Sequence, residues 1–96
     1  MTAYSDLDHL VRPAETLRAI AHPIRLAIID LLHQNQQMSV TEIYEHLDIQ
    51  QAVASHHLKI LKDKYVVKVK RDGKSSLYSL KSDEYYQIFA RITDLA

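Results

Sequence analysis

The chain has 96 residues, 47% of them hydrophobic, which is typical of one small globular domain. It contains no cysteine, so disulfides, thiolate metal sites and a cysteine nucleophile are excluded. No apolar run approaches the roughly 18 residues of a membrane span, and the acidic N-terminus lacks the basic segment of a secretory signal. We therefore expect a cytoplasmic protein.

The formal net charge is zero, but the charged residues are unevenly distributed along the chain. Residues 1–49 carry three arginines against seven acidic residues, a net charge of −4. Residues 50–80 carry seven basic against two acidic residues, a net charge of +5. A basic block on a neutral chain is typical of electrostatic contact with nucleic acid, and the alternative is an ordinary solvated lysine-rich surface.

Two helices are predicted in the N-terminal third. Apolar residues at helical spacing predict the first over about residues 7–20, and since Pro13 fits only a first turn, the helix begins either near residue 7 or at Pro13. His22 precedes Pro23, a pair that ends one helix and suits the start of the next. The segment that begins at Pro23 is apolar around most of its circumference, which predicts a helix at the centre of the core.

A helix-turn-helix arrangement is predicted next. Ser39 and Glu42 have the spacing of a capping box and open a short helix that ends near Leu47. A tight turn follows, and residues 51–63 form the next helix. Two short helices joined by a turn of three or four residues are the layout of a helix-turn-helix motif.

After Lys64 the apolar period changes from helical to alternating, which predicts a β-hairpin. Asp72-Gly73 between two alternating runs is a strong turn signal, because both central residues of such a turn need positive φ. The predicted cross-strand pairs are Arg71 with Lys74, Val69 with Ser76, and Val67 with Tyr78. Val67, Val69 and Tyr78 are then expected on the core side of the hairpin. A last helix is predicted over about residues 82–95.

The adjacent histidines of the segment 51–63 point in different directions on a helical wheel. His57 lies near the middle of the apolar face, whereas His56 lies at the border of the polar face. Helical neighbours do not share a face, so the two are a poor pair of metal ligands. We expect His57 to be a packed, hydrogen-bonded structural residue and His56 to be a surface residue.

Catalysis has little support in this sequence. A nucleophile, a base and an orienting group must converge in a concave pocket, but the only hydroxyl near the histidines is Ser55, on a convex helix beside lysines. We therefore expect the protein not to be an enzyme.

The polar face of residues 51–63 and the predicted hairpin together carry the basic excess. Polar side chains on a helix suit base readout in the major groove, and basic side chains on a projecting hairpin suit phosphate contacts. The candidate DNA-binding residues are Gln51, Ser55, His56, Lys59 and Lys62 on the helix, with Lys70, Arg71 and Lys74 on the hairpin.

Residues 17–80 resemble the ArsR/SmtB family of bacterial winged helix-turn-helix repressors. The resemblance depends on three segments in order: AHPIR at the start of the second helix, SHHLKIL, and RDGK in the hairpin. It implies a mainly α fold with a β-hairpin, in the order α-α-α-α-β-β-α, as a single winged-helix domain over residues 1–96. It also implies that residues 51–62 form the recognition helix and residues 66–80 the wing.

The resemblance further implies a homodimer whose interface is built by the first and last helices. Their apolar residues also exceed what a core of this size readily covers, and such surface usually marks an interface. The candidate interface residues are Leu10, Leu17, Ile20, Tyr85, Ile88, Phe89 and Ile92.

The chain departs from this family at the metal sites of many relatives. Residues 41–47 lack the Cys-x-Cys pair, and Asp83-Glu84-Tyr85 lacks the histidine of the site on the last helix. We therefore expect no metal and no cofactor. His9, His22, His33 and His46 form no pair at helical spacing, so they contain no local ligand motif. A site assembled from histidines of two subunits stays open.

The resulting hypothesis is a sequence-specific, dimeric transcriptional regulator that acts as a repressor at a palindromic operator. Two alternatives are a winged-helix module for protein–protein interaction and a non-specific architectural DNA binder. The sequence identifies neither the operator, nor an inducer, nor the direction of regulation.

Overall fold

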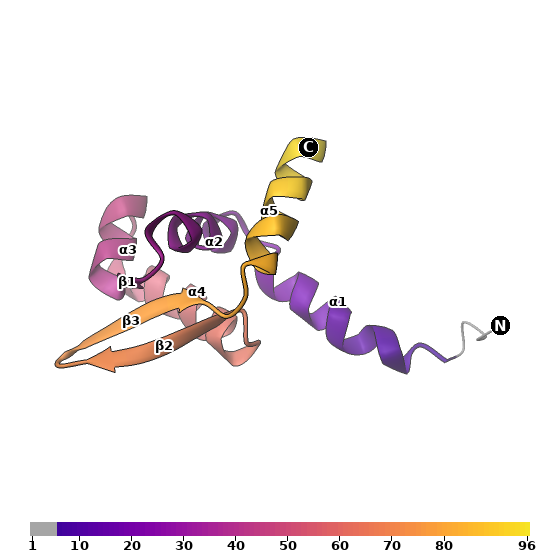
Figure 1. The fold of residues 1–96 in the computed structure, drawn as a ribbon, viewed down its shortest axis with the longest axis horizontal. Coiled ribbons are helices and arrows are strands. Elements are labelled where there is room, and N and C mark those ends of the chain that lie inside the picture. The colour runs from indigo at the N-terminus through magenta and orange to yellow at the C-terminus, as the bar shows by residue number, and fades with distance from the viewer. Residues whose placement is uncertain (1–5) are drawn as a thin grey trace.

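The computed structural model describes residues 6–96, which form five helices and a three-stranded sheet. The helices are α1 (Asp8–Ile20), α2 (Pro23–Asn35), α3 (Val40–Leu47), α4 (Gln51–Asp63) and α5 (Glu84–Leu95), and the strands are β1 (Met38–Ser39), β2 (Val67–Asp72) and β3 (Ser75–Leu80). Helix α1 and the β2–β3 hairpin extend to opposite sides of a body that contains α2, α3 and α4 (Figure 1). The predicted fold class is confirmed, with β1 as an unpredicted addition.

Helix α1 contains Pro13 in its interior. It begins at Asp8, the earlier of the two starts that the sequence allowed. Proline offers no N–H, so the carbonyl of His9, four residues earlier, receives no helical hydrogen bond. His9 and Pro13 are both exposed, which lets water hydrate that carbonyl. The helix buries side chains only at its end, at Ala19 and Ile20.

Helix α2 is the central helix, as its apolar sequence predicted. The ring Nδ1 of His22 accepts a hydrogen bond from the backbone N–H of Ile24 at 3.1 Å, and Pro23 occupies the first helical position. Both features fit the start of a helix, where an N–H lacks a partner and proline costs nothing. Ile28 and Ile29 are fully buried, so the helix packs on more than one side.

The helix-turn-helix motif is formed by α3 and α4. Ser39 caps α3 with the predicted capping box, in which its hydroxyl accepts from the N–H of Glu42 and the Glu42 carboxylate accepts from the N–H of Ser39. Asp48 ends α3 in the left-handed conformation, with φ of 53°. Two further residues lead to Gln51, where α4 begins as predicted.

Strand β3 is the middle strand of an antiparallel sheet in the order β1-β3-β2. The two-residue strand β1 pairs Met38 with Tyr78 and Ser39 with Leu77. Since Ser39 is also the cap of α3, this pairing places the start of α3 directly beside the hairpin.

The hairpin turn differs from the sequence prediction by one position. Asp72 pairs with Ser75, so Gly73 and Lys74 form the turn. Gly73 has φ of 62° and Lys74 has no positive φ, the pattern of a type II′ turn with glycine first. The observed pairs are Arg71 with Ser76, Val69 with Tyr78, and Val67 with Leu80, so the predicted pairs are wrong by two residues on β3. Because side chains alternate with period two, the predicted sharing of one face by Val67, Val69 and Tyr78 is unaffected.

The hydrophobic core lies between α2, α3, α4 and the sheet. Its buried members are Ile20, Ile28, Ile29, Leu32, Met38, Ile43, Leu58, Leu61, Val66 and Val67. Helix α5 contributes half-buried residues only, and among residues 6–96 no helix is long and apolar enough to cross a bilayer.

Candidate nucleic-acid interface

Helix α4 presents a polar face to solvent and an apolar face to the core. Ala54, Leu58 and Leu61 are fully buried. The opposite face carries the five predicted contact residues, all exposed: Gln51, Ser55, His56, Lys59 and Lys62. Their spacing of three or four residues places most of them in one row along the helix.

Lys59 in this row forms an ion pair within α4. Lys59 donates a hydrogen bond through Nζ to Asp63 Oδ2 at 2.9 Å, one helical turn further along α4. The sequence analysis named Lys59 as a contact residue and did not predict its pairing with Asp63. Asp63 therefore neutralises part of the basic surface at the C-terminal end of the helix.

The hairpin carries the three other predicted contact residues. Lys70, Arg71 and Lys74 are all exposed. The observed register places Arg71 opposite Ser76 and Lys70 opposite Leu77, so their side chains leave opposite faces of the sheet. Lys74 lies in the turn itself, at the tip of the hairpin, rather than on a strand as predicted.

A polar groove of about 380 Å³ lies between the start of α3, helix α4 and the hairpin. Its lining residues are Ser39, Val40, Thr41, Ser55, Lys74, Ser75, Ser76 and Tyr78. Sequence reasoning selected only Ser55 and Lys74 from this set. Thr41 and Ser76 were missed, because they line one groove only when β1 brings the start of α3 beside the hairpin.

The two adjacent histidines of α4 have the environments that the helical wheel predicted. His57 is only 6% exposed, and its Nδ1 accepts a hydrogen bond from Arg25 Nε at 3.1 Å. Burial lowers the pKa of His57, and the nearby positive charges of His22, Arg25 and His56 lower it further. His56 is exposed, so the expectation of a structural His57 and a surface His56 is confirmed.

The predicted dimer surface is only partly exposed. Leu10, Leu17 and Ile92 are exposed, and Tyr85, Ile88 and Phe89 are half-buried against the core. Ile20 is 5% exposed and belongs to the core of the protomer, so its assignment to the interface is corrected. The reason is that α1 turns its last residues toward α2 and leaves its earlier apolar residues uncovered.

Within residues 6–96 no group of three or more histidine, aspartate or glutamate side chains is placed to hold a metal ion. The rings of His22 and His57 have centroids 4.4 Å apart, and those of His56 and His57 are 5.2 Å apart. His57 Nδ1 already accepts a hydrogen bond from the positively charged Arg25, which disfavours a metal ion at the same ring.

A family model described as a helix-turn-helix domain matches residues 20–69. The HTH-type transcriptional regulator MJ1325 of Methanocaldococcus jannaschii is 34% identical over 88% of this chain and 94% of its own. The transcriptional repressor SmtB of Mycobacterium tuberculosis is 44% identical over 69% of this chain, which spans 48% of that relative. The chain belongs to the ArsR/SmtB family of winged helix-turn-helix transcriptional regulators.

Solved structures agree with this family assignment. The homodimeric winged helix-turn-helix DNA-binding domain Mb0332 of Mycobacterium bovis superimposes with a TM-score of 0.82 at 28% identity, over 99% of this chain and 89% of that one. The basic excess of the chain lies on α4 of the helix-turn-helix motif and on the β2–β3 hairpin of this winged fold.

Proposed function

We propose that this ArsR/SmtB regulator binds a palindromic operator as a homodimer and acts there as a repressor. The observation that carries the proposal is the juxtaposition of α4 with the wing, which border one polar groove and hold the positive excess of the chain. SmtB of Mycobacterium tuberculosis is a named repressor, which supports the direction of regulation.

Base readout is assigned to the N-terminal half of α4. Gln51, Ser55 and His56 are exposed polar side chains with donors and acceptors, which is what the edges of bases in the major groove require. The opposite side of the same helix is anchored in the core by Leu58 and Leu61. The residues proposed to contact bases therefore lie on an element whose position is fixed by packing.

Phosphate contacts are assigned to the cations and to the polar groove. Lys70, Arg71 and Lys74 on the wing, with Lys59 and Lys62 on α4, supply charge without sequence preference. Thr41 and Ser76 line the polar groove between α4 and the wing, and their hydroxyls are assigned as hydrogen-bond donors to phosphates.

Dimer formation is assigned to α1 and α5. Leu17 and Ile92 are 55% and 53% exposed, and Leu10 is also exposed on α1. A second copy of the chain is the occupant proposed for this surface, which fits the homodimeric relative from Mycobacterium bovis. A two-fold dimer presents two recognition helices to one side of the duplex, so the half-sites are expected about one helical turn apart.

Titration of a random-sequence duplex at increasing salt tests the proposal. Six to ten phosphate contacts predict an affinity loss of roughly 10³- to 10⁵-fold between 50 and 200 mM salt. A protein-interaction module would show no such binding. An architectural binder would show the salt dependence but equal affinity for every duplex in competition.

A further inference from the structure

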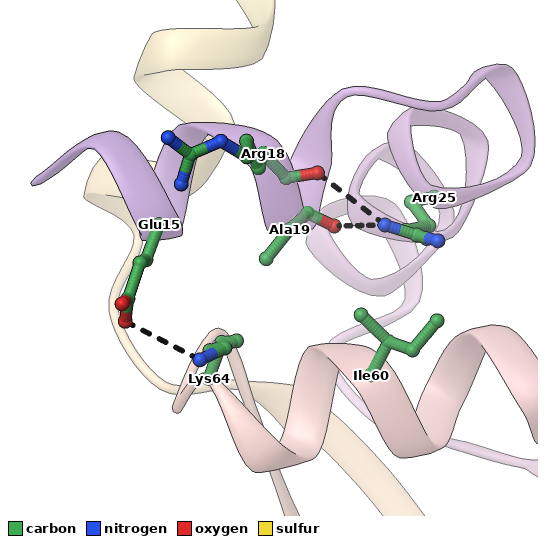
Figure 2. Close-up of a pocket in the computed structure, with 6 residues that line it drawn as sticks. All are labelled: Glu15, Arg18, Ala19, Arg25, Ile60 and Lys64. Carbon is green, nitrogen blue, oxygen red and sulfur yellow. Dashed lines mark hydrogen bonds and ion pairs between the residues drawn. The ribbon is translucent and has the colours of Figure 1, made fainter. Parts of the chain in front are cut away.

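Arg25 connects the C-terminal end of α1 to the recognition helix. Its Nη1 donates to the carbonyl oxygens of Ala19 at 3.1 Å and Arg18 at 3.4 Å, and its Nε donates to His57 Nδ1 on α4 at 3.1 Å. Figure 2 shows Arg25 directed at the two carbonyls of the last turn of α1, with α4 below. One guanidinium thus joins the helix that carries the dimer surface to the helix that reads DNA.

A second contact joins the same two elements at the far side of the hollow in Figure 2. Lys64, the C-cap of α4, lies 3.3 Å from the carboxylate of Glu15 on α1. Both of these side chains are substantially exposed, so this ion pair contributes little to holding the helices. The half-buried Arg25 and the buried His57 therefore provide the stronger connection between α1 and α4.

The connection requires a neutral His57. Arginine has only donors, so the ring nitrogen that faces Arg25 Nε must be the unprotonated acceptor, with the proton on Nε2. The neighbouring His22 also uses its Nδ1 as an acceptor, from the N–H of Ile24. The charged or titratable groups around His57 are thus His22 at the N-cap of α2, Arg25 of α2 and His56 of α4. Glu15 of α1 is paired with Lys64.

We propose that Arg25 and His57 are positioning residues for the recognition helix, and that protonation of His57 releases α4 and switches specific DNA binding off in acid. The inference rests on the proposed DNA-binding function. It assigns no contact with DNA to either residue.

Protonation places an N–H on His57 Nδ1 directly against the N–H of Arg25, and it places a positive charge beside a guanidinium in a buried position. Burial and the neighbouring cations already lower the pKa of His57, so the neutral form is the one that the fold favours. Displacement of Arg25 relieves this repulsion and removes the connection between α1 and α4. A hollow of about 310 Å³ beside Arg25, open to solvent, gives the displaced guanidinium a hydrated position.

The sign of the effect is specific to a positioning histidine. A surface that gains positive charge in acid strengthens binding to every duplex. A positioning histidine that must stay neutral weakens specific binding instead. The loss approaches about tenfold per protomer for each pH unit below the pKa of His57, because binding is linked to the release of one proton.

The test measures the affinity for an operator selected from random duplexes, and for a random duplex, between pH 7.5 and 5.5. His57→Asn retains an acceptor near the position of Nδ1 but cannot titrate. His46→Asn is the matched control, with the same change at an exposed histidine of α3 that has no proposed contact with DNA. Wild type and His46→Asn are expected to lose specific affinity in acid, whereas His57→Asn keeps it.

Identical pH profiles for wild type and His57→Asn would overturn the inference and leave the proposed function intact. Failure of the wild type to prefer any duplex at pH 7.5 would overturn both. If His57→Asn does not fold, nitrogen NMR of the wild-type ring decides the question. Operator binding is then expected to lower the pKa of His57, by reciprocal linkage, and an unchanged or raised pKa would contradict the inference.

Discussion

Lys59 Nζ lies 2.9 Å from Asp63 Oδ2 on the exposed side of α4. An exposed pair of this spacing contributes only about 0.3–0.5 kcal/mol to stability, but it engages a cation that we propose as a phosphate contact. We expect Asp63→Asn to raise the affinity for DNA of any sequence and to steepen the salt dependence by up to about 0.9 log units per protomer.

The control for this change is Asp94→Asn, which removes the same charge from exposed α5. Fluorescence anisotropy at several salt concentrations measures both variants. Equal gains from the two substitutions would show that net charge, not the release of Lys59, controls the affinity.

Arg71 is expected to contact phosphate without reading sequence. Arg71→Ala should weaken binding to operator and random duplexes alike and reduce the salt slope by roughly one unit per lost contact per protomer. Lys81→Ala, which removes a positive charge after the end of β3, is the comparison variant. A change in sequence preference alone would make Arg71 a base reader.

Thr41 and Ser76 line the groove between α3, α4 and the wing, and each is expected to donate one hydrogen bond to the DNA backbone. Thr41→Ala and Ser76→Ala should each weaken the binding of every duplex by about 0.5–1.5 kcal/mol per lost contact. Ser79→Ala is the matched control, because its side chain lies on the opposite face of β3 from Ser76. If Ser79→Ala costs as much affinity as Ser76→Ala, the groove has no special role.

Much of this site follows from local sequence patterns. The capping box at Ser39 and the 3.6-residue period of α4 depend on neighbours within one turn, so the exposed row of α4 and the burial of His57 were predictable. The hairpin faces were also predictable, because a register error of two residues leaves the alternation unchanged. The position of Lys74 was not, since Asp72-Gly73 and Gly73-Lys74 both satisfy a two-residue turn.

Other features depend on contacts between elements that are distant in the chain. Strand β1 forms only because β3 offers it a partner, and it creates the groove that contains Thr41 and Ser76. The apolar pattern of α1 could not separate Leu17 from Ile20, because which one α2 covers is set by the crossing of the two helices. Arg25 bonds to His57, which is 32 positions away, and no local signal indicates that pair.

The stability of the fold is expected to fall in acid because of His57. Burial lowers its pKa in the folded protein below the ordinary value of about 6.5, so the unfolded chain binds more protons between the two values. The contribution of neutral His57 to the free energy of unfolding is complete above about pH 6.5. It is lost as the pH falls through the pKa that His57 has in the folded protein. Urea unfolding from pH 8 to 5 should show this loss in wild type and His46→Asn but not in His57→Asn.

His57→Ala should in addition destabilise the protein by roughly 1–3 kcal/mol at pH 7.5, since it removes a packed, hydrogen-bonded group. His56→Ala should change stability by no more than about 0.5 kcal/mol and cost about 1–3 kcal/mol in discrimination at one base pair per half-site. Unfolding by His56→Ala together with altered DNA preference in His57→Ala would show that His56, not His57, faces the core.

Leu17 and Ile20 are expected to respond differently to substitution. Leu17→Glu places a charge on the proposed dimer surface and should yield a folded monomer, whereas Ile20→Ala should cost about 2–5 kcal/mol of stability and leave the surface intact. Sedimentation at tens of micromolar, with thermal melts, separates the two effects. A monomeric wild type at that concentration would contradict the dimer.

Selection of bound sequences from a random duplex pool is the decisive measurement for operator binding by a dimer. We expect enrichment of one inverted repeat whose half-sites are centred about 10 base pairs, or a multiple, apart, because a two-fold dimer presents two copies of α4 to the duplex. The selected sequence should change in His56→Ala at one position of each half-site. Recovery of a pool without any enriched sequence, or of a single unrepeated site, would contradict it.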